Sequence, residues 1–157
     1  MFNLAGASDF DFFIGSWHVQ HRRLRERLVG SDDWESFAGT SVARKVVGGL
    51  GNIEEMAMER ATGQTEGMTV RLYDPATQLW SLYWADSVQG ILQPPMVGRF
   101  QDGCGEFYDR ETIGQHSAFS RFTWSDITPT TCHWEQALSV DGGRTWETNW
   151  MMEFTCC

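Results

Sequence analysis

Two segments near the C-terminus read Cys132-His133-Trp134-Glu135-Gln136-Ala137-Leu138-Ser139-Val140 and Trp146-Glu147-Thr148-Asn149-Trp150-Met151-Met152-Glu153-Phe154. In each segment apolar and aromatic side chains take every second position, and the carboxylates fall between them. This period of two is that of a β-strand with one buried face. We therefore expect a hairpin with an aromatic inner face that also holds two polar groups, each in need of a partner. The expected inward side chains include Trp134, Gln136, Thr148 and Trp150.

The same period recurs through the rest of the chain and is broken by clusters of Gly, Asp and Pro roughly every 8–15 residues. After a short aromatic segment at 10–13, we predict about ten strands with short connections and no long amphipathic helix between them. Residues 21–28, with Leu24 and Leu28, also fit a helix. So many strands in meander order favour an all-β, antiparallel barrel, because closure removes exposed sheet edges. The predicted strands lie near residues 16–28, 34–47, 52–59, 65–73, 78–86, 91–101, 106–112, 117–125, 130–140 and 146–155.

Length and composition predict one domain over residues 1–157. The chain has 157 residues, 41% of them hydrophobic and 21% charged, which excludes intrinsic disorder. It contains 8 Trp, 10 Phe and 3 Tyr, more aromatic area than a small core needs. We therefore expect some of these rings to line a cavity.

The net charge of −9 excludes sequence-independent nucleic-acid binding, because such a field repels phosphate backbones. One basic run, His21 to Arg27, fits either the solvated face of a strand, which we favour, or an anion-binding patch.

No stretch approaches the ~18 apolar residues of a membrane span. The first residues do not resemble an export signal, so we expect a cytoplasmic protein. The cysteines are then expected to be free thiols: Cys104, Cys132, Cys156 and Cys157.

The remaining motifs indicate structure more than chemistry. The segment from Ser139 to Trp146 matches the Asp-box pattern S-x-D-x-G-x-T-W, which shapes a hairpin turn. Strand spacing puts His18 and His21 on opposite faces, so they cannot share a metal ion, and no metal site is predicted. No nucleophile elbow, phosphate loop or dinucleotide fingerprint is present, so no cofactor is expected. A lone histidine as a haem ligand is the alternative.

A second hairpin is predicted around Asp74-Pro75-Ala76-Thr77. If Tyr73 faces Gln78, Arg71 lies opposite Trp80, with Leu82 and Trp84 on the same face. A guanidinium there forms a cation–π contact with indole rings or binds a ligand carboxylate or phenolate. The opposite face would expose an apolar patch that favours a homodimer; alternatively, the segment from Phe2 to Phe13 covers it. This patch consists of Val70, Leu72 and Tyr83.

Several motifs together resemble the lipocalins and the wider calycin barrels, and in particular a bacterial lipocalin-like family of unknown function. They are Phe12-Phe13-Ile14-Gly15-Ser16-Trp17, Gly48-Gly49-Leu50-Gly51-Asn52-Ile53-Glu54, Arg71-Leu72-Tyr73-Asp74-Pro75 and Trp134-Glu135-Gln136-Ala137-Leu138-Ser139. The resemblance implies a single barrel of about eight to ten strands with a ligand cavity. It also implies a short helical turn that closes one end, with Trp17 packed over it. Lipocalins place a late-strand arginine over this Trp; the final predicted strand has none, so Arg121 or Arg144 would substitute.

The cavity that the resemblance implies leads us to expect binding of a small hydrophobic or aromatic molecule. The alternative is a cofactor-free enzyme acting on such a molecule, a cyclase, isomerase or hydratase. Its acid would be among Glu54, Glu55, Glu106, Glu111 and Glu135, with none assigned. A third interpretation is that the tryptophans only fill the core. The predicted ligand-binding residues are Trp17, Arg71, Tyr73, Trp80, Trp84, Arg121, Trp134, Gln136 and Trp150.

Overall fold

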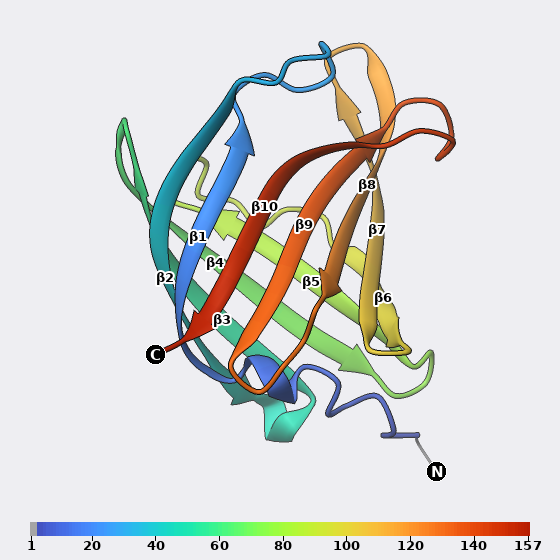
Figure 1. Ribbon diagram of the computed structural model, residues 1–157. Coiled ribbons are helices and arrows are strands. Elements are labelled where there is room, and N and C mark those ends of the chain that lie inside the picture. The colour runs from blue at the N-terminus through green and yellow to red at the C-terminus, as the bar shows by residue number, and fades with distance from the viewer. Residues whose placement is uncertain (1–2) are drawn as a thin grey trace.

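The computed structural model describes residues 3–157, which form a closed antiparallel barrel of ten strands. Each strand pairs with its neighbours in the chain, and β1 pairs with β10 to close the ring (Figure 1). The predicted all-β antiparallel barrel is confirmed. The strands are β1 (Gly15–Leu24), β2 (Trp34–Val46), β3 (Gly51–Arg60), β4 (Gly63–Asp74), β5 (Leu79–Asp86), β6 (Met96–Gln101), β7 (Cys104–Ile113), β8 (His116–Ser125), β9 (Thr131–Ser139) and β10 (Glu147–Cys156).

Two strands are shorter than predicted. β1 ends at Leu24, and residues 25–33 form a loop that is neither strand nor helix, with Leu28 at a φ of 63°. β6 begins only at Met96, because Pro94 and Pro95 have no N–H to donate to a ladder. As a result β5 and β6 pair over only three residues each, Trp80–Leu82 with Met96–Gly98.

The β4–β5 hairpin has a different register from the predicted one. Tyr73 lies opposite Trp80, and Arg71 lies opposite Leu82, so the expected pairing of Arg71 with Trp80 is wrong. The turn takes in Gln78, which has a φ of 60° and donates its backbone N–H to the carbonyl of Asp74. Because the shift is two residues, every side chain keeps its predicted face.

A β-bulge in β10 changes the faces of the C-terminal hairpin. Trp150 lies opposite Gln136 but Thr148 lies opposite Ala137, so an extra residue sits between Thr148 and Trp150. The expectation that Thr148 points inward is therefore wrong, since it shares the face of Ala137. Asn149 is buried in its place, and its Oδ1 accepts a hydrogen bond of 2.8 Å from Gln136.

The turn between β9 and β10 is built by the Asp-box segment, as predicted. The carboxylate of Asp141 accepts hydrogen bonds from the backbone of Arg144, from the hydroxyl of Ser139, and from both the backbone and the hydroxyl of Thr145. The indole N–H of Trp146 donates to the carbonyl of Gly143. Each polar group of the motif is used within the turn, so its role is structural.

The N-terminal segment fills one end of the barrel. It contains the short 3-10 helix η1 (Asp11–Phe13), and Phe10 and Phe13 are fully buried there. Trp17 donates its indole N–H to the carbonyl of Phe13 at 2.9 Å and stacks on the Phe13 ring. The predicted helical turn under Trp17 is confirmed. A second 3-10 helix, η2 (Val47–Gly49), lies at the same end (Figure 1).

The outer face of the β4–β5 hairpin stays uncovered by residues 3–13, and Phe2 lies outside the described residues. Leu72 is exposed there, with Val70 and Tyr83 half-buried beside it. The N-terminal segment instead crosses the barrel end, where Tyr73 donates to the carbonyl of Asn3.

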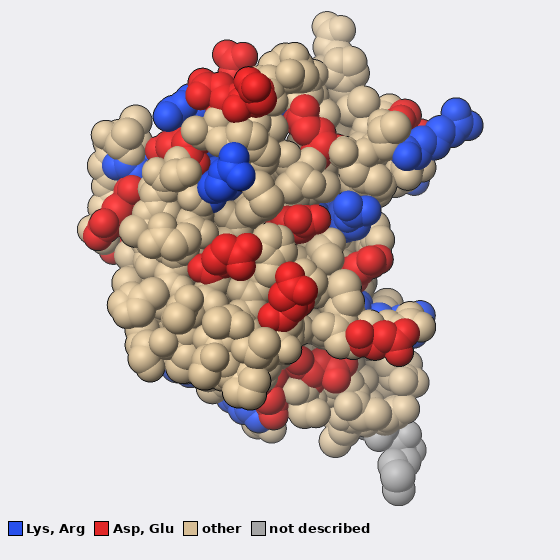
Figure 2. Space-filling model, in the orientation of Figure 1, with Lys and Arg blue, Asp and Glu red and all other residues tan. Residues whose placement is uncertain are grey.

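Charged side chains of both signs are spread over the face of the barrel that Figure 2 shows, in keeping with a chain of net charge −9. The four cysteines are free. Among residues 3–157, no helix has the length and apolar character needed to cross a membrane.

Candidate functional site

The half of the barrel away from η1 encloses a cavity of about 520 Å³. Its floor lies at Arg71 and Trp124, above the filled end. Its mouth lies among Arg23, Asp86 and Glu111, at the opposite ends of their strands. The volume falls within the ~300–1,000 Å³ of small-molecule sites.

Three tryptophans form one wall of the cavity. Trp134 meets Trp150 edge-to-face, with ring centroids 5.5 Å apart, and Trp150 meets Trp84 in the same way at 6.3 Å. Phe122 extends this wall and lies 4.9 Å from Trp134. Gly67 makes room for Trp84, because a Cβ at this position would lie 2.0 Å from the indole. The wall is thus aromatic and apolar, with successive indoles nearly perpendicular to each other.

The floor of the cavity carries a buried ion pair. Arg71 on β4 donates to Glu54 on β3 at 2.5 Å and to Asn52 at 2.9 Å, and Ser41 donates to the other oxygen of Glu54 at 2.7 Å. The side chains of Arg71 and Glu54 are only 3% and 4% exposed. Each charge is therefore compensated by its partner and by neutral hydrogen bonds.

Aromatic rings surround the guanidinium of Arg71. It lies 5.1 Å from the ring centroids of Phe10 and Phe13 and 5.5 Å from Trp124, which is cation–π distance. The indole that Arg71 contacts is that of Trp124, in place of the predicted Trp80 and Trp84. Arg71 also lies over Phe13, which stacks on Trp17, whereas Arg121, one of the two arginines expected over Trp17, lies over Trp146.

The mouth of the cavity is lined by charged side chains. On β1, the guanidinium of Arg23 lies 4.4 Å over the ring of Trp150. On β5, Asp86 accepts hydrogen bonds from the indole N–H of Trp84 and from two backbone N–H groups, which hold its pKa below the usual value. On β7, burial raises the pKa of Glu111. The rim is therefore polar, in contrast to the aromatic wall of the cavity.

Five of the nine predicted ligand-binding residues line this cavity. Three others lie in the filled end: Trp17, which packs against η1, and Tyr73 and Trp80, which form hydrogen bonds with the N-terminal segment at Gly6. Arg121 points to the outer face, where its guanidinium lies 4.2 Å over Trp146. The lining residues are Arg71, Trp84, Trp134, Gln136 and Trp150.

Sequence reasoning missed Arg23. We interpreted the basic run from His21 to Arg27 as solvated, yet Arg23 lines the cavity. The sequence does indicate an inward Arg23, because it is an even number of residues from Trp17 and His21 along β1 and so shares their inner face.

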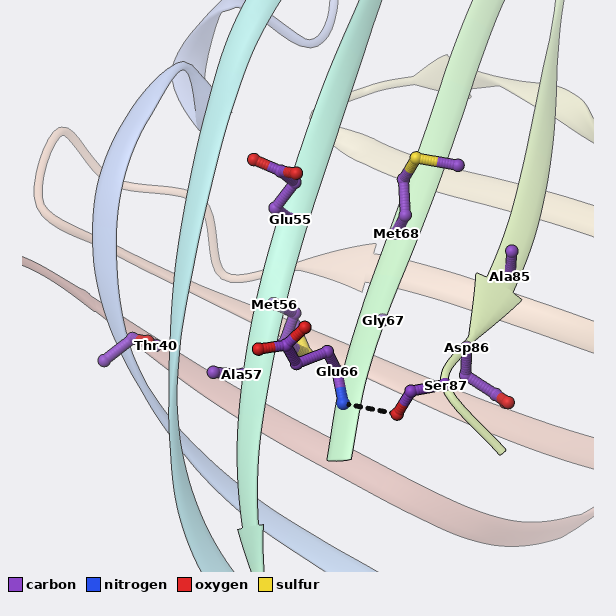
Figure 3. Close-up of a pocket in the computed structure, with 10 residues that line it drawn as sticks. All are labelled: Thr40, Glu55, Met56, Ala57, Glu66, Gly67, Met68, Ala85, Asp86 and Ser87. Atoms are coloured by element: carbon purple, nitrogen blue, oxygen red, sulfur yellow. Dashed lines mark hydrogen bonds between the residues drawn. The ribbon is translucent and has the colours of Figure 1, made fainter. Parts of the chain in front are cut away.

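A second hollow lies on the outer face of β2 to β5 (Figure 3). It is a shallow depression over small side chains such as Ala57 and Ala85, with Glu55 and Glu66 beside it. The backbone N–H of Glu66 donates to the hydroxyl of Ser87 within it, at 2.9 Å. It holds no cation and no aromatic ring, so the interior cavity is the stronger candidate site.

Metal binding has little support from the geometry. His18 is exposed and His21 is buried, on opposite faces of β1 as predicted. Among residues 3–157, no three His, Cys, Asp or Glu side chains are grouped so that they could hold an ion.

Comparison with known proteins gives a match in structure alone. The S-type phycobiliprotein lyase CPES from Guillardia theta superposes on 96% of this chain and 91% of its own, with a TM-score of 0.61 and 11% sequence identity. The fold is that of the lipocalin-like calycin barrels. At this identity the likeness shows the calycin fold and nothing finer. No family model matches the sequence, and no curated protein is similar to it.

Proposed function

We propose that this calycin barrel binds a small hydrophobic or aromatic molecule in its interior cavity. The observation that carries the proposal is one cavity that combines a wall of three indoles with the polar Arg71–Glu54 floor. The indoles supply apolar contact area, and the polar floor distinguishes one end of a ligand from the other. A cavity of about 520 Å³ also argues against the interpretation that the tryptophans only fill the core.

The proposal can be tested with N-phenyl-1-naphthylamine, a neutral aromatic probe whose emission rises in apolar surroundings. We expect saturable binding of one probe per chain. Trp134→Leu removes part of the indole wall and should weaken binding about tenfold. Trp146→Leu is the matched control, because this indole lies outside the cavity. Absence of saturable binding, or equal effects of the two substitutions in folded protein, would contradict the proposal.

One observation favours the enzyme alternative, a cofactor-free cyclase, isomerase or hydratase. Glu111 lines the cavity, and burial raises its pKa, which is the direction that a general acid requires. A protein that is named as a lyase also has the calycin fold.

The enzyme alternative is tested by incubating the protein with a metabolite extract and following its components by mass spectrometry. A compound converted by the wild type and spared by Glu111→Gln supports catalysis. If no compound is converted, binding alone remains as the function.

A further inference from the structure

Arg23 is placed to meet a ligand at the cavity mouth. It belongs to the inner face of β1 and lines the cavity, and its Cζ lies 4.4 Å from the centroid of the Trp150 ring. The five N–H donors of a guanidinium can hold a carboxylate, sulfonate or phosphate through two hydrogen bonds at once.

The carboxylates near Arg23 are already engaged. Glu35 lies directly opposite Arg23 in the β1–β2 ladder, but its oxygens are bound by Arg60 at 2.6 and 3.4 Å. Asp86 accepts from the indole of Trp84 and from two backbone N–H groups. Across residues 3–157, the ion pairs of arginines involve Arg25, Arg60 and Arg71, and Arg23 takes part in none.

Other cations gather around Arg23. Arg27 also lines the cavity. Burial, Arg60 and Arg27 lower the pKa of Arg23 to about 10, because the carboxylates of Glu35 and Asp86 offset them only in part. A partly desolvated cation beside other cations, with no ion pair of its own, is unfavourable until an anion joins it. These cations lie close together in a chain whose net charge is −9, that is, in which acidic residues outnumber basic ones.

We propose that the ligand carries an anionic group, a carboxylate, sulfonate or phosphate, which Arg23 binds at the mouth while the apolar body lies against the tryptophan wall. This inference rests on the proposed function and names the ligand class of the same cavity. The opposite rim carries the carboxylates of Asp109 and Glu111, and Arg110 between them lies 5.2 Å over the ring of Phe119. The two carboxylates repel an anion and so favour its approach to the β1 side. The anionic group stays at the mouth, and the apolar body extends along the tryptophan wall toward the charge-compensated Arg71–Glu54 floor.

Two matched probes test the inference. 8-Anilinonaphthalene-1-sulfonate has the framework of N-phenyl-1-naphthylamine plus one sulfonate, so the pair differs by a single anionic group. We expect Arg23→Gln to weaken binding of the sulfonate about tenfold more than it weakens binding of the neutral probe. Added salt should weaken the sulfonate more than the neutral probe.

Neighbouring substitutions provide the controls. Arg22→Gln changes the adjacent outward arginine, which lies over Trp34, and should alter neither affinity. Arg23→Lys keeps the charge and should restore part of the sulfonate binding. Circular dichroism confirms that each variant is folded.

The outcomes separate the two proposals. If the neutral probe binds but Arg23→Gln affects both probes equally, or leaves the sulfonate unaffected, the anion inference fails and the proposed function stands. If neither probe binds the wild-type protein, the proposed function fails and the inference fails with it.

Discussion

Trp150 on β10 donates its indole N–H to Nδ1 of His21 on β1 at 3.1 Å, and both side chains are buried. The bond joins the first and last strands, where the ring of strands closes. Since Nδ1 accepts this bond, the neutral imidazole is assigned its proton on Nε2. Burial, together with Arg23 and Arg60, lowers the pKa of His21 to about 3.

The low pKa of His21 predicts a loss of stability in acid. In the unfolded chain His21 binds a proton near pH ~6.5, and in the folded chain only near pH 3. Between these values the unfolded state binds more protons, so the free energy of unfolding falls as pH falls, by about 1.4 kcal/mol per pH unit. His21→Gln should remove this part of the slope, measured by urea unfolding from about pH 7 to about pH 4. His18→Gln, on the outer face, should keep it; a wild-type slope in His21→Gln would contradict the assignment.

The ion pair at the cavity floor predicts strong coupling between its members. Arg71→Met leaves Glu54 buried without its cation and should cost about 3–5 kcal/mol of unfolding free energy. The double variant with Glu54→Gln should cost clearly less than the sum of the two single changes. Urea denaturation of all four proteins measures the coupling, and additive effects would show that the two charges do not depend on each other. Arg25→Met, at an exposed pair, should cost less than about 1 kcal/mol.

The close approach of Trp84 to Gly67 predicts that a substitution at Gly67 makes the cavity smaller and leaves its polar groups unchanged. A methyl group at this position would lie 2.0 Å from the Trp84 ring, so Gly67→Ala must displace the indole toward the cavity. We expect a loss of about 1–3 kcal/mol in stability and weaker binding of N-phenyl-1-naphthylamine. Met68→Ala, the next residue on the same strand, is the control and should leave the affinity unchanged. An unchanged affinity in Gly67→Ala would show that Trp84 does not limit the space for a ligand.

The homodimer remains a prediction, and it rests on the uncovered outer face of β4 and β5. Leu72 is 37% exposed there beside Val70 and Tyr83. If two copies associate through this patch, Leu72→Glu should convert a dimer to a monomer, because it places a charge in the interface. Size-exclusion chromatography with light scattering measures the mass. A wild-type monomer at all accessible concentrations would rule the dimer out.

The strands and their faces were predictable wherever alternation is unbroken. Trp134, Gln136 and Trp150 were assigned inward from the period of two alone, and β9 and β10 place them so. The bulge at Asn149 was not predictable, since one extra residue leaves no mark in the pattern of residue types. The bulge reverses the faces only of the β10 residues that precede it. Thr148 therefore lies on the face opposite to the predicted one, and Trp150 lies on the predicted face.

The division of the interior into a filled end and a cavity could not be read from the sequence. Alternation places Trp80 and Trp84 on the same inner face, but it does not tell how far the N-terminal segment reaches into the barrel. Phe10 and Phe13 enter that space, so Trp80 becomes part of the packed end and Trp84 part of the cavity wall. Arg121 is predicted as a ligand-binding residue, yet it lies three residues before Trp124 in β8, and this odd spacing indicates the outer face.

The ladder between β5 and β6 has only three residue pairs, so the strands of the barrel are not held equally firmly all the way round. Every other neighbouring pair of strands is held by a longer ladder, so thermal opening of the wall is cheapest along this line. The loop that follows β5 contributes Gln89, Gln93 and Pro94 to the cavity lining, so the place that opens most readily is also next to the ligand space. The wall of the barrel is thus held least tightly beside the cavity lining, and local separation of β5 from β6 leaves the other nine strand pairs hydrogen-bonded.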